Sequence, residues 1–375
     1  MQKNYWSMAK KNEDKGLIAK TTEDVFDEKN SVLADALKQV SGEEPRVFLV
    51  ADANVVNRTD GLGKKIGRYV QAHGIRLAGS PLVISGGEKI KADNFQSVMT
   101  ATEAMLESRL GCNDTVLVLG GGSVLDVAGY AAAQVRGGVK IVRMPTTVAS
   151  MVDSAFSHTA AVDSVNVKDA MRVSCVPSAV IVDTLFAKTV LDGVWRGGIS
   201  AVVRMGAVLD APLMKKLAKL AGRFNTRDYE AMAEIVNAAV AVRLKKGCSE
   251  FSDWSAFRLE SMSAYKLPHG YATAIAVCID AAYAVDKGYL KSSDQEVICG
   301  VLAECGALDG LQHSRHLLSQ PDSILLGLDA WRLSHGSEAI ELPSGIGRLK
   351  VEESPDREAL RRIITEFREE SEKAQ

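Results

Sequence analysis

The sequence has few cysteines, no excess of one charge and no long apolar run, and each absence excludes a class of protein. Its 45 Lys and Arg residues balance 47 Asp and Glu to a net charge of −2, so there is no general attraction to nucleic acid or anionic membrane. The six cysteines form no Cys-x-x-Cys pair, and we expect buried thiols instead of a disulfide framework or zinc site. No apolar run reaches transmembrane length, and the polar first 20 or so residues, an expected loose arm, lack a secretory apolar core. We predict a cytoplasmic protein with neither nucleic-acid nor membrane partners.

The length and the apolar periodicity predict two domains. A chain of 375 residues, 46% hydrophobic and 25% charged, can bury a large core. Strand and helix patterns alternate in the first half, and the period is helical in the second. We expect an α/β domain over residues 1–192 and an all-helical domain over residues 193–375. A hinge is expected where Gly193, Gly197 and Gly198 interrupt the pattern.

The most informative stretch is 115–153. It opens with an apolar β run at 115–119, followed by three glycines and an Ala-rich helical segment at about 123–135. A second apolar run at 139–144 ends at Pro-Thr-Thr. Strand, glycine turn, helix and strand together predict a βαβ unit of a parallel sheet.

The three glycines, Gly120, Gly121 and Gly122, suit a phosphate-binding turn. They let backbone N–H groups approach a phosphate, and the start of the helix behind them carries partial positive charge. Ser123 is the expected N-cap of that helix. The spacing is neither Gly-x-Gly-x-x-Gly nor a Walker loop, because no Gly-Lys-Ser/Thr follows. A tight turn without a ligand is the alternative, although ligands favour the carboxyl ends of strands in such sheets.

Polar residues also follow other predicted strands. Asp52 and Asn54 come after the apolar run 46–51, where a carboxylate can accept hydrogen bonds from a ribose. A strand-end Asx turn is the alternative. A strand at 80–85 leads into a charged segment, which is either part of a binding site or a solvated charge cluster. The last strand of this half is expected at 179–184.

Two segments resemble the signature of the dehydroquinate synthase-like superfamily: GGGSVLD at 120–126 and MPTTVASMVDS at 144–154. The triple glycine, the aspartate four residues later and the Pro-Thr-Thr keep the family's spacing, and the resemblance extends from about residue 25 to about residue 351. The superfamily includes dehydroquinate synthase, other sugar-phosphate cyclases, and glycerol and iron-dependent alcohol dehydrogenases. The resemblance implies a Rossmann-like domain followed by a helical domain, NAD as cofactor, and an active site in the cleft between the domains.

By this resemblance, residues at the strand ends hold the nucleotide. The family's Asp-x-Asn contacts the adenosine end of NAD, its Gly-Glu-x-x-Lys segment helps to hold the nucleotide, and the end of the last strand lines the nicotinamide. The strand-end aspartate disfavours NADP, because its charge repels a 2′-phosphate. The residues predicted to bind the cofactor are Asp52, Asn54, Glu88, Lys91, Gly120, Gly121, Gly122, Ser123, Asp126, Thr146, Thr147 and Thr184.

The family's substrate loop follows Pro-Thr-Thr, and this chain departs from it. Asp153 matches the aspartate of the family's Val-Asp-Ser, and Lys168 matches the lysine of a later Lys-Asn pair. Between them, Thr159 replaces a lysine and Asp163 replaces an asparagine. Losing a cation and gaining a carboxylate disfavours an anionic substrate bound in the family manner. The resemblance makes Asp153, Lys168 and His269 the candidate catalytic acid–base groups.

The metal ligands that the resemblance implies are mostly missing. Members acting on sugar phosphates bind one zinc or cobalt through a glutamate and two histidines of the helical domain. Ala201 stands at the glutamate position, and Asp253 at the first histidine position, seven residues before Glu260. His269 alone remains, as the second histidine. Because two protein ligands rarely hold zinc well, we expect NAD without a zinc or cobalt site; a weak Asp253–His269 site is the alternative.

Within the superfamily, the sequence most resembles the sugar-phosphate cyclases, in the sedoheptulose 7-phosphate cyclase branch of 2-epi-5-epi-valiolone synthase. Those enzymes use NAD transiently to oxidise a hydroxyl, eliminate phosphate, reduce the ketone again and close a carbocycle. Three functions stay open: a divergent cyclase, a metal-free NAD-dependent oxidoreductase, and a non-catalytic nucleotide-binding partner of an active paralogue. The expected substrate is a sugar phosphate or polyol, and the family makes a homodimer the default.

Overall fold

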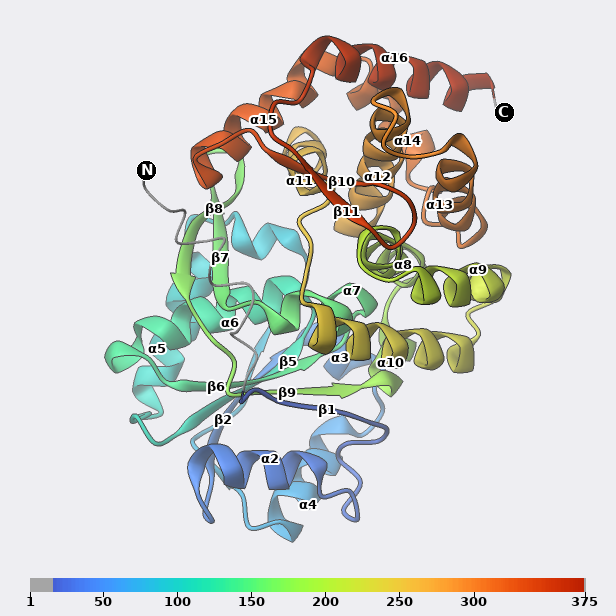
Figure 1. Cartoon of the computed structure of the whole chain (residues 1–375). Coiled ribbons are helices and arrows are strands. Elements are labelled where there is room, and N and C mark those ends of the chain that lie inside the picture. The colour runs from blue at the N-terminus through green and yellow to red at the C-terminus, as the bar shows by residue number, and fades with distance from the viewer. Residues whose placement is uncertain (1–15, 374–375) are drawn as a thin grey trace. The chain divides into compact units, whose positions relative to one another are not determined.

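The computed structural model describes residues 16–373, which form two compact units (Figure 1). The α/β unit holds the described residues up to Val165, together with Asp169–Leu191. The helical unit holds Asn166–Lys168 and the described chain from Asp192 onward. The predicted fold class, an α/β domain followed by a helical domain, is confirmed.

A parallel sheet is the core of the α/β unit. Its strands are β1 (Ile18–Thr22), β2 (Arg46–Asp52), β3 (Arg76–Leu77), β4 (Leu82–Ile84), β5 (Thr115–Gly120), β6 (Lys140–Pro145) and β9 (Ala179–Asp183). They follow the order β1-β9-β6-β5-β2-β3, with β4 also paired to β2, and every pairing is parallel. Strands β5 and β9 are wholly buried, as near-continuous apolar runs covered on both faces should be. Most of the expected N-terminal arm or tail lies outside the described residues, and its end forms β1, which pairs with β9 as an arm ordered by contact would.

Helices cover both faces of this sheet. The unit contains α2 (Val32–Ser41), α3 (Ala53–Arg58), α4 (Leu62–Ala72), α5 (Gln96–Glu107), α6 (Gly122–Gln134) and α7 (Val148–Val152). Helices α2 and α4 lie on one face, and α5 and α6 on the other (Figure 1). The 3-10 turns are η1 (Glu88–Lys91), η2 (Val135–Gly137), η3 (Ser154–Phe156) and η4 (Thr184–Thr189). The predicted substrate loop contains two paired strands, β7 (Thr159–Ser164) and β8 (Val167–Ser174).

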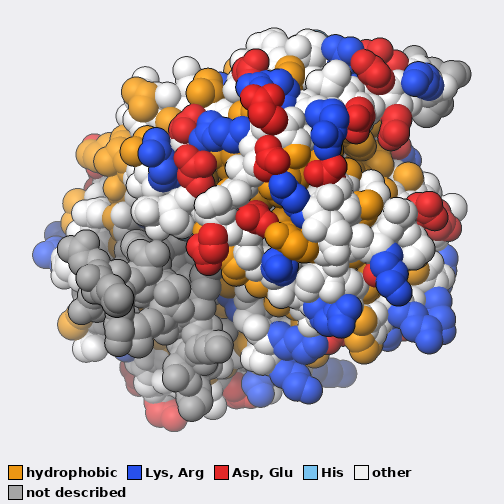
Figure 2. Space-filling model, turned by 45° about the horizontal axis from the view of Figure 1, so that its top comes forward, with side chains coloured by type: hydrophobic (Ala, Val, Ile, Leu, Met, Phe, Trp, Pro, Cys, Tyr) orange, Lys and Arg blue, Asp and Glu red, His pale blue; other side chains and the backbone are white. Residues whose placement is uncertain are grey.

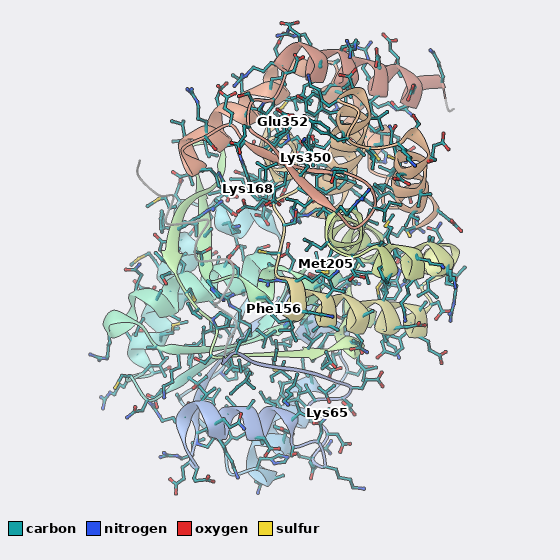
Figure 3. The ribbon with its side chains drawn as sticks, viewed as in Figure 1. Lys65, Phe156, Lys168, Met205, Lys350 and Glu352 are labelled. Atoms are coloured by element: carbon teal, nitrogen blue, oxygen red, sulfur yellow. The ribbon has the colours of Figure 1, made fainter. Side chains whose placement is uncertain are left out.

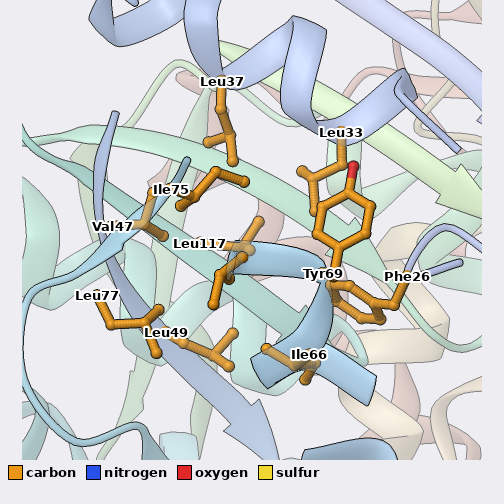
Figure 4. A pocket seen from close by; sticks show the side chains of 11 residues that line it. Phe26, Leu33, Leu37, Val47, Leu49, Ile66, Tyr69, Ile75, Leu77 and Leu117 are labelled. Carbon is orange, nitrogen blue, oxygen red and sulfur yellow. The ribbon is translucent and has the colours of Figure 1, made fainter. Parts of the chain in front are cut away.

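An apolar pocket lies where α2 and α4 pack on the sheet (Figure 4). Its lining includes Phe26, Leu33, Leu49 and Tyr69. The Tyr69 hydroxyl oxygen accepts a hydrogen bond from the Ala34 N–H at 3.0 Å, which satisfies the polar end of that side chain. Because no charged side chain lines this pocket, it is a gap in core packing and does not resemble a site for a polar substrate.

The helical unit contains longer helices and one short hairpin. Its elements are α8 (Asp192–Val208), α9 (Ala211–Asn225), α10 (Tyr229–Lys246), α11 (Asp253–Met262), α12 (His269–Asp286), α13 (Ser292–Glu304), α14 (Leu311–Leu318), α15 (Pro321–His335), α16 (Arg357–Lys373), β10 (Ile340–Pro343) and β11 (Leu349–Glu352). Aspartates start two helices: the Asp210 and Asp228 carboxylates accept the Leu213 and Ala231 N–H groups. The antiparallel hairpin β10–β11 was not predicted. Acidic and basic side chains are interspersed over much of the described surface in Figure 2, in keeping with the net charge of −2.

The chain passes from one unit to the other between Leu191 and Asp192, within the range 191–198 expected for the hinge, but the glycines themselves do not interrupt the helical pattern. Helix α8 starts at Asp192 and runs through all of them. A Cβ built on Gly270 would lie 2.3 Å from the carbonyl carbon of Gly197, so α8 and the start of α12 meet backbone to backbone. Glycine is therefore required at both positions by close packing. This crossing fixes His269, the first residue of α12, beside α8.

Candidate functional site

The residues predicted to bind the cofactor gather at one edge of the parallel sheet. Asp52 and Gly120 end β2 and β5, and Thr146 and Thr184 follow β6 and β9. All these strands are parallel, so their carboxyl ends share an edge. From β2 the chain continues to β3 and β4 on one side, whereas from β5 it continues to β6 on the other. Such a reversal creates the crevice in which open α/β sheets bind ligands.

The glycine turn at this edge leaves no room for side chains. A Cβ on Gly120 would lie 2.6 Å from Val124, and one on Gly121 would lie 3.0 Å from Thr147. Gly121 is extended (φ −73°, ψ 176°), and α6 begins at Gly122. Within the described chain, no side chain caps this helix start. A close backbone approach and an uncapped helix start fit the pyrophosphate of a dinucleotide.

Ser123 is not the N-cap of α6, contrary to our expectation. The helix starts one residue earlier than predicted, because the Gly121 carbonyl accepts the Val124 and Leu125 N–H groups, each at 3.0 Å. Ser123 thus lies in the first turn, and its hydroxyl donates to Glu88 Oε2 at 3.3 Å. The structure brings together two predicted cofactor residues here.

The two predicted threonines have partners within the protein. The Thr146 N–H donates to the Gly120 carbonyl at 3.0 Å, and Thr146 is buried. Thr147 is the N-cap of α7, and its hydroxyl accepts the Ser150 N–H at 3.3 Å in a capping box. Thr184, also buried, begins η4. These contacts place the residues at the sheet edge, while their contact with a cofactor stays a prediction.

Asp52 and Asn54 form one rigid group. The Asp52 carboxylate accepts the Asn54 backbone N–H at 2.8 Å and the Asn54 side-chain amide at 3.1 Å, so Asp52 caps α3. Gly86 packs on this carboxylate: a Cβ there would lie 2.3 Å from Oδ2. The Asx-turn alternative therefore describes the local geometry, and the geometry also fixes an acceptor where a ribose is expected.

Lys91 is buried at the centre of a cluster of carboxylates. Its Nζ lies 2.5 Å from Asp169, 2.8 Å from Asp126, 3.3 Å from Glu88 and 4.0 Å from Asp163. Sequence reasoning assigned Glu88, Lys91 and Asp126 to the cofactor site, and the structure brings these three together. The sequence did not indicate that Asp163 and Asp169 are their neighbours, because only the β7–β8 hairpin places those two residues here.

Four carboxylates lie within 4.0 Å of the Lys91 ammonium, and one of them, Asp169, also lies 4.0 Å from the Arg172 guanidinium. Burial lowers the pKa of Lys91, but the carboxylates outweigh it and hold that pKa well above its ordinary value. Burial raises the pKa of Asp126, and the Lys91 ammonium opposes that rise. Oxygens of Glu88, Asp163 and Asp169 lie within 4.8 Å of one another, a spacing that suits a metal. Lys91 Nζ already supplies the positive charge there.

Two of the three predicted catalytic residues share one partner in the helical unit. The Glu260 carboxylate, almost fully buried, contacts His269 Nδ1 at 2.7 Å through Oε1 and Lys168 Nζ at 3.0 Å through Oε2. Of these three residues, Lys168 is labelled in Figure 3. Asp153 belongs to the α/β unit, where its N–H donates to the Ala149 carbonyl at the end of α7. In the sequence, Glu260 served only to locate Asp253 seven residues earlier, and its contacts with both Lys168 and His269 were not predicted.

The positions that correspond to the family's metal ligands do not form a donor set. Ala201, on α8, carries only a methyl group. One turn later, Arg204 donates from Nη1 to Asp253 Oδ1 and from Nη2 to the Ser249 carbonyl at 2.8 Å. His269 directs Nδ1 to Glu260. Among the described residues, the only group of three or more donors close enough to hold a metal is the one around Lys91. The helical unit therefore does not fit the zinc or cobalt ligand set of the family.

A buried carboxyl group, Asp280, lies close to this region on α12. Its Oδ2 accepts the indole N–H of Trp254 at 3.2 Å. Burial raises the pKa of Asp280 to about 8, although the polar Ser252 and Trp254 side chains oppose the rise. Asp280 is thus mostly protonated and neutral near pH 7.

We predict that Asp280→Asn changes the pH dependence of stability. The folded protein holds the Asp280 proton up to about pH 8, whereas the unfolded chain loses it near the ordinary value of about 3.9. Between these values Asp280 makes the free energy of unfolding fall as pH rises, by at most about 1.4 kcal/mol per unit. The variant lacks this slope, so its stability relative to wild type should rise between about pH 5 and about pH 8. Urea unfolding at several pH values measures it, and a difference constant with pH would contradict the buried neutral acid.

No helix in the described part of the chain has the length and apolar character needed to cross a membrane. This agrees with the absence of a long apolar run in the sequence.

The chain resembles known proteins in both sequence and structure. Residues 81–196 match the family described as 3-dehydroquinate synthase N-terminal. The 3-dehydroquinate synthase of Saccharolobus solfataricus is 26% identical over 288 residues, covering 72% of this chain and 80% of that protein. A 2-epi-5-epi-valiolone synthase from an Actinomyces species is 27% identical over 304 residues, covering 75% of this chain and 77% of that protein.

Two solved structures share the fold. The 2-epi-5-epi-valiolone synthase of Streptomyces hygroscopicus subsp. jinggangensis, solved with NAD+ and Zn2+ bound, superposes with a TM-score of 0.81 at 21% identity and covers 94% of this chain and 97% of that one. A 2-deoxy-scyllo-inosose synthase complexed with carbaglucose-6-phosphate, NAD+ and Co2+ superposes with a TM-score of 0.75 at 18% identity and covers 93% and 96%. The glycine turn, the parallel sheet, the matched family model and the sequence relatives all support a relationship of this chain to the dehydroquinate synthase-like superfamily.

Proposed function

We propose that this chain is an NAD-dependent enzyme of the sugar-phosphate cyclase type, in which His269 is the acid–base group. The observation that carries the proposal is the Glu260 carboxylate, which holds His269 Nδ1 at 2.7 Å and Lys168 at 3.0 Å. A buried carboxylate that orients an imidazole is a recurrent arrangement in acid–base catalysis. A protein that only bound nucleotide would have no use for it.

The geometry assigns a role to each of these three side chains. Glu260 accepts a hydrogen bond from His269 Nδ1–H, which leaves the lone pair on Nε2. The His269 side chain is 39% exposed, so Nε2 can reach a substrate hydroxyl. Lys168 neutralises the other oxygen of Glu260 and keeps its carboxylate directed at the imidazole. His269 then takes the hydroxyl proton during oxidation and returns it when the ketone is reduced.

The α/β unit supplies the cofactor site in this proposal. The uncapped start of α6 and the glycine turn fit the pyrophosphate, and Asp52 fits a ribose. NAD supplies the hydride acceptor when bound. Both solved structures of this fold hold NAD+ and a metal, and the 2-deoxy-scyllo-inosose synthase also holds carbaglucose-6-phosphate, which supports the same class of substrate for this chain. Asp163, which replaces a family asparagine, is buried, and its carboxylate lies 4.0 Å from Lys91 Nζ. A sugar phosphate or a polyol therefore remains the proposed substrate, and a cytoplasmic homodimer is the proposed form of the protein.

A metal-free oxidoreductase is the second candidate, favoured by the missing ligand at Ala201. The two activities differ in their products. A cyclase releases phosphate and regenerates NAD, whereas an oxidoreductase accumulates NADH. Asp153, whose role no contact assigns, stays a candidate acid–base group for either reaction.

The proposal is tested by incubating the protein with NAD and a panel of seven-carbon and six-carbon sugar phosphates and polyols. We expect one of them to give phosphate or NADH, and we expect NAD to stabilise the protein by about 2.7 kcal/mol at a concentration 100 times its Kd. The matched control is Asp52→Asn, which keeps the helix cap but removes the charge, and it should weaken the preference for NAD over NADP. If NAD stabilises the protein but no product forms, the non-catalytic nucleotide-binding partner is the function that remains. If NAD does not stabilise the protein, the predicted NAD site is refuted.

A further inference from the structure

The helical unit contains basic side chains where its family relatives hold a metal. Arg204 lies three residues after Ala201 on α8, so the two side chains lie on the same face of the helix. Arg204 is only 6% exposed, and its guanidinium contacts the Asp253 carboxylate and the Ser249 carbonyl. A guanidinium is always charged in proteins. A divalent cation that approached Asp253 would therefore meet a fixed positive charge instead of an available ligand.

A second ion-paired carboxylate, Glu260, lies on α11 two turns after Asp253. Asp253 and Glu260 are seven residues apart on α11, which places both carboxylates on one face. Glu260 is paired with Lys168 at 3.0 Å and with His269 at 2.7 Å. Asp253 and His269 thus belong to two separate ion-pair clusters, one centred on Arg204 and one on Lys168. The weak Asp253–His269 site that the sequence left open does not correspond to this arrangement.

The remaining acid of the region is also unsuited to a metal. Metal ligation requires an ionised carboxylate. The raised pKa of Asp280 keeps its carboxyl group largely protonated near neutral pH. Ala201 offers no donor atom. Every acidic side chain named here is therefore either paired with a protein cation or neutral.

We infer that this chain has exchanged the divalent metal of its family for two fixed protein cations, Arg204 and Lys168, and works without zinc or cobalt. The part of this inference that concerns catalysis rests on the proposed function; the part that concerns binding does not. Each cation is paired with a protein carboxylate and offers no open coordination position, so the helical unit supplies no Lewis acid to the substrate hydroxyl. Oxidation then depends on the oriented imidazole of His269.

The experiment measures zinc in the protein itself. Wild-type protein, produced in zinc-supplemented medium and dialysed, should contain less than about one-tenth of a zinc ion per chain by elemental analysis, because two protein ligands rarely hold zinc. A rebuilt variant with Ala201→Glu, Arg204→Ala and Asp253→His offers a glutamate and two histidines together with His269. This variant should gain about one zinc per chain, as three protein ligands suffice for catalytic zinc sites.

Each outcome decides the inference. Stoichiometric zinc in the wild type would overturn it, and so would a folded rebuilt variant that takes up no zinc, because the three positions would then not surround a metal. If the rebuilt variant does not fold, the zinc content of the wild type decides alone. The metal measurement is independent of turnover. A metal-free wild type that NAD fails to stabilise would refute the proposed function and leave this inference standing.

Discussion

Replacing Lys91 with methionine is expected to destabilise the α/β unit by about 3–5 kcal/mol, the usual cost of removing one partner from a buried ion pair. Methionine keeps the length and the apolar stem of lysine but removes the ammonium that lies within 4.0 Å of all four carboxylates. Those carboxylates would then repel one another in a buried site. Urea unfolding of the two proteins measures the change.

The same variant should show a distinctive pH dependence. Without the ammonium, the pKa values of the cluster carboxylates rise, so the folded variant binds protons that the unfolded chain has lost. Its stability deficit should therefore be greatest above about pH 6 and shrink as the pH falls toward about 4. A deficit that grows on acidification would contradict the cluster.

Asp163→Asn is the matched control for this prediction. The Asp163 side chain accepts the Asp169 N–H at 2.8 Å, and asparagine can keep that hydrogen bond. The substitution removes one of the carboxylates that share a single ammonium, so alone it should be neutral or stabilising. Combined with Lys91→Met, it should recover part of the lost stability, because fewer buried charges remain unbalanced. If Lys91→Met costs less than about 1 kcal/mol, the ammonium is not what holds this cluster together.

Replacing His269 with alanine is expected to lower kcat by about 10²–10⁴, the usual contribution of a positioned acid–base group. The variant should keep the stabilisation by NAD, because no predicted cofactor residue is changed. Glu260→Gln should share much of the loss, since glutamine can favour the wrong tautomer of the imidazole. Steady-state rates with the substrate found in the panel measure both effects.

His313→Ala is the matched control for the histidine variant. His313 is exposed on α14, and its ring contacts the neighbouring Gln312 side chain. Its loss should leave kcat unchanged. A His269→Ala enzyme with normal kcat, or one that has lost its stabilisation by NAD, would show that His269 is a structural residue.

The gathering of many of the predicted cofactor residues at one sheet edge could be predicted from the sequence, because it follows from local patterns. The turn Gly120-Gly121-Gly122 and the pair Thr146-Thr147 each follow an apolar run, and parallel strands bring such ends together. Asp52 and Asn54 are likewise neighbours in the chain. These predictions required only the strand pattern, and the sheet topology supplied the proximity.

The contacts that give the site its charge were not predictable in the same way. Lys91 and Asp169 are 78 residues apart, and only the β7–β8 hairpin brings them together. Glu260 and Lys168 are 92 residues apart in the chain, so neither spacing nor periodicity indicated that pair. The start of α6 was misplaced by one residue, because the extended conformation of Gly121, not the cap preference of Ser123, decides where that helix begins.

The central claim is that this chain uses NAD for hydride transfer without a divalent metal. It is tested most directly by mixing NAD-loaded protein rapidly with the substrate in the presence of a strong zinc chelator and following NADH absorbance and phosphate release in a single turnover. We predict that NADH forms at the same rate with and without the chelator, and that it decays as phosphate appears if the enzyme is a cyclase. Loss of the NADH signal on chelation, with recovery on adding zinc, would contradict the account.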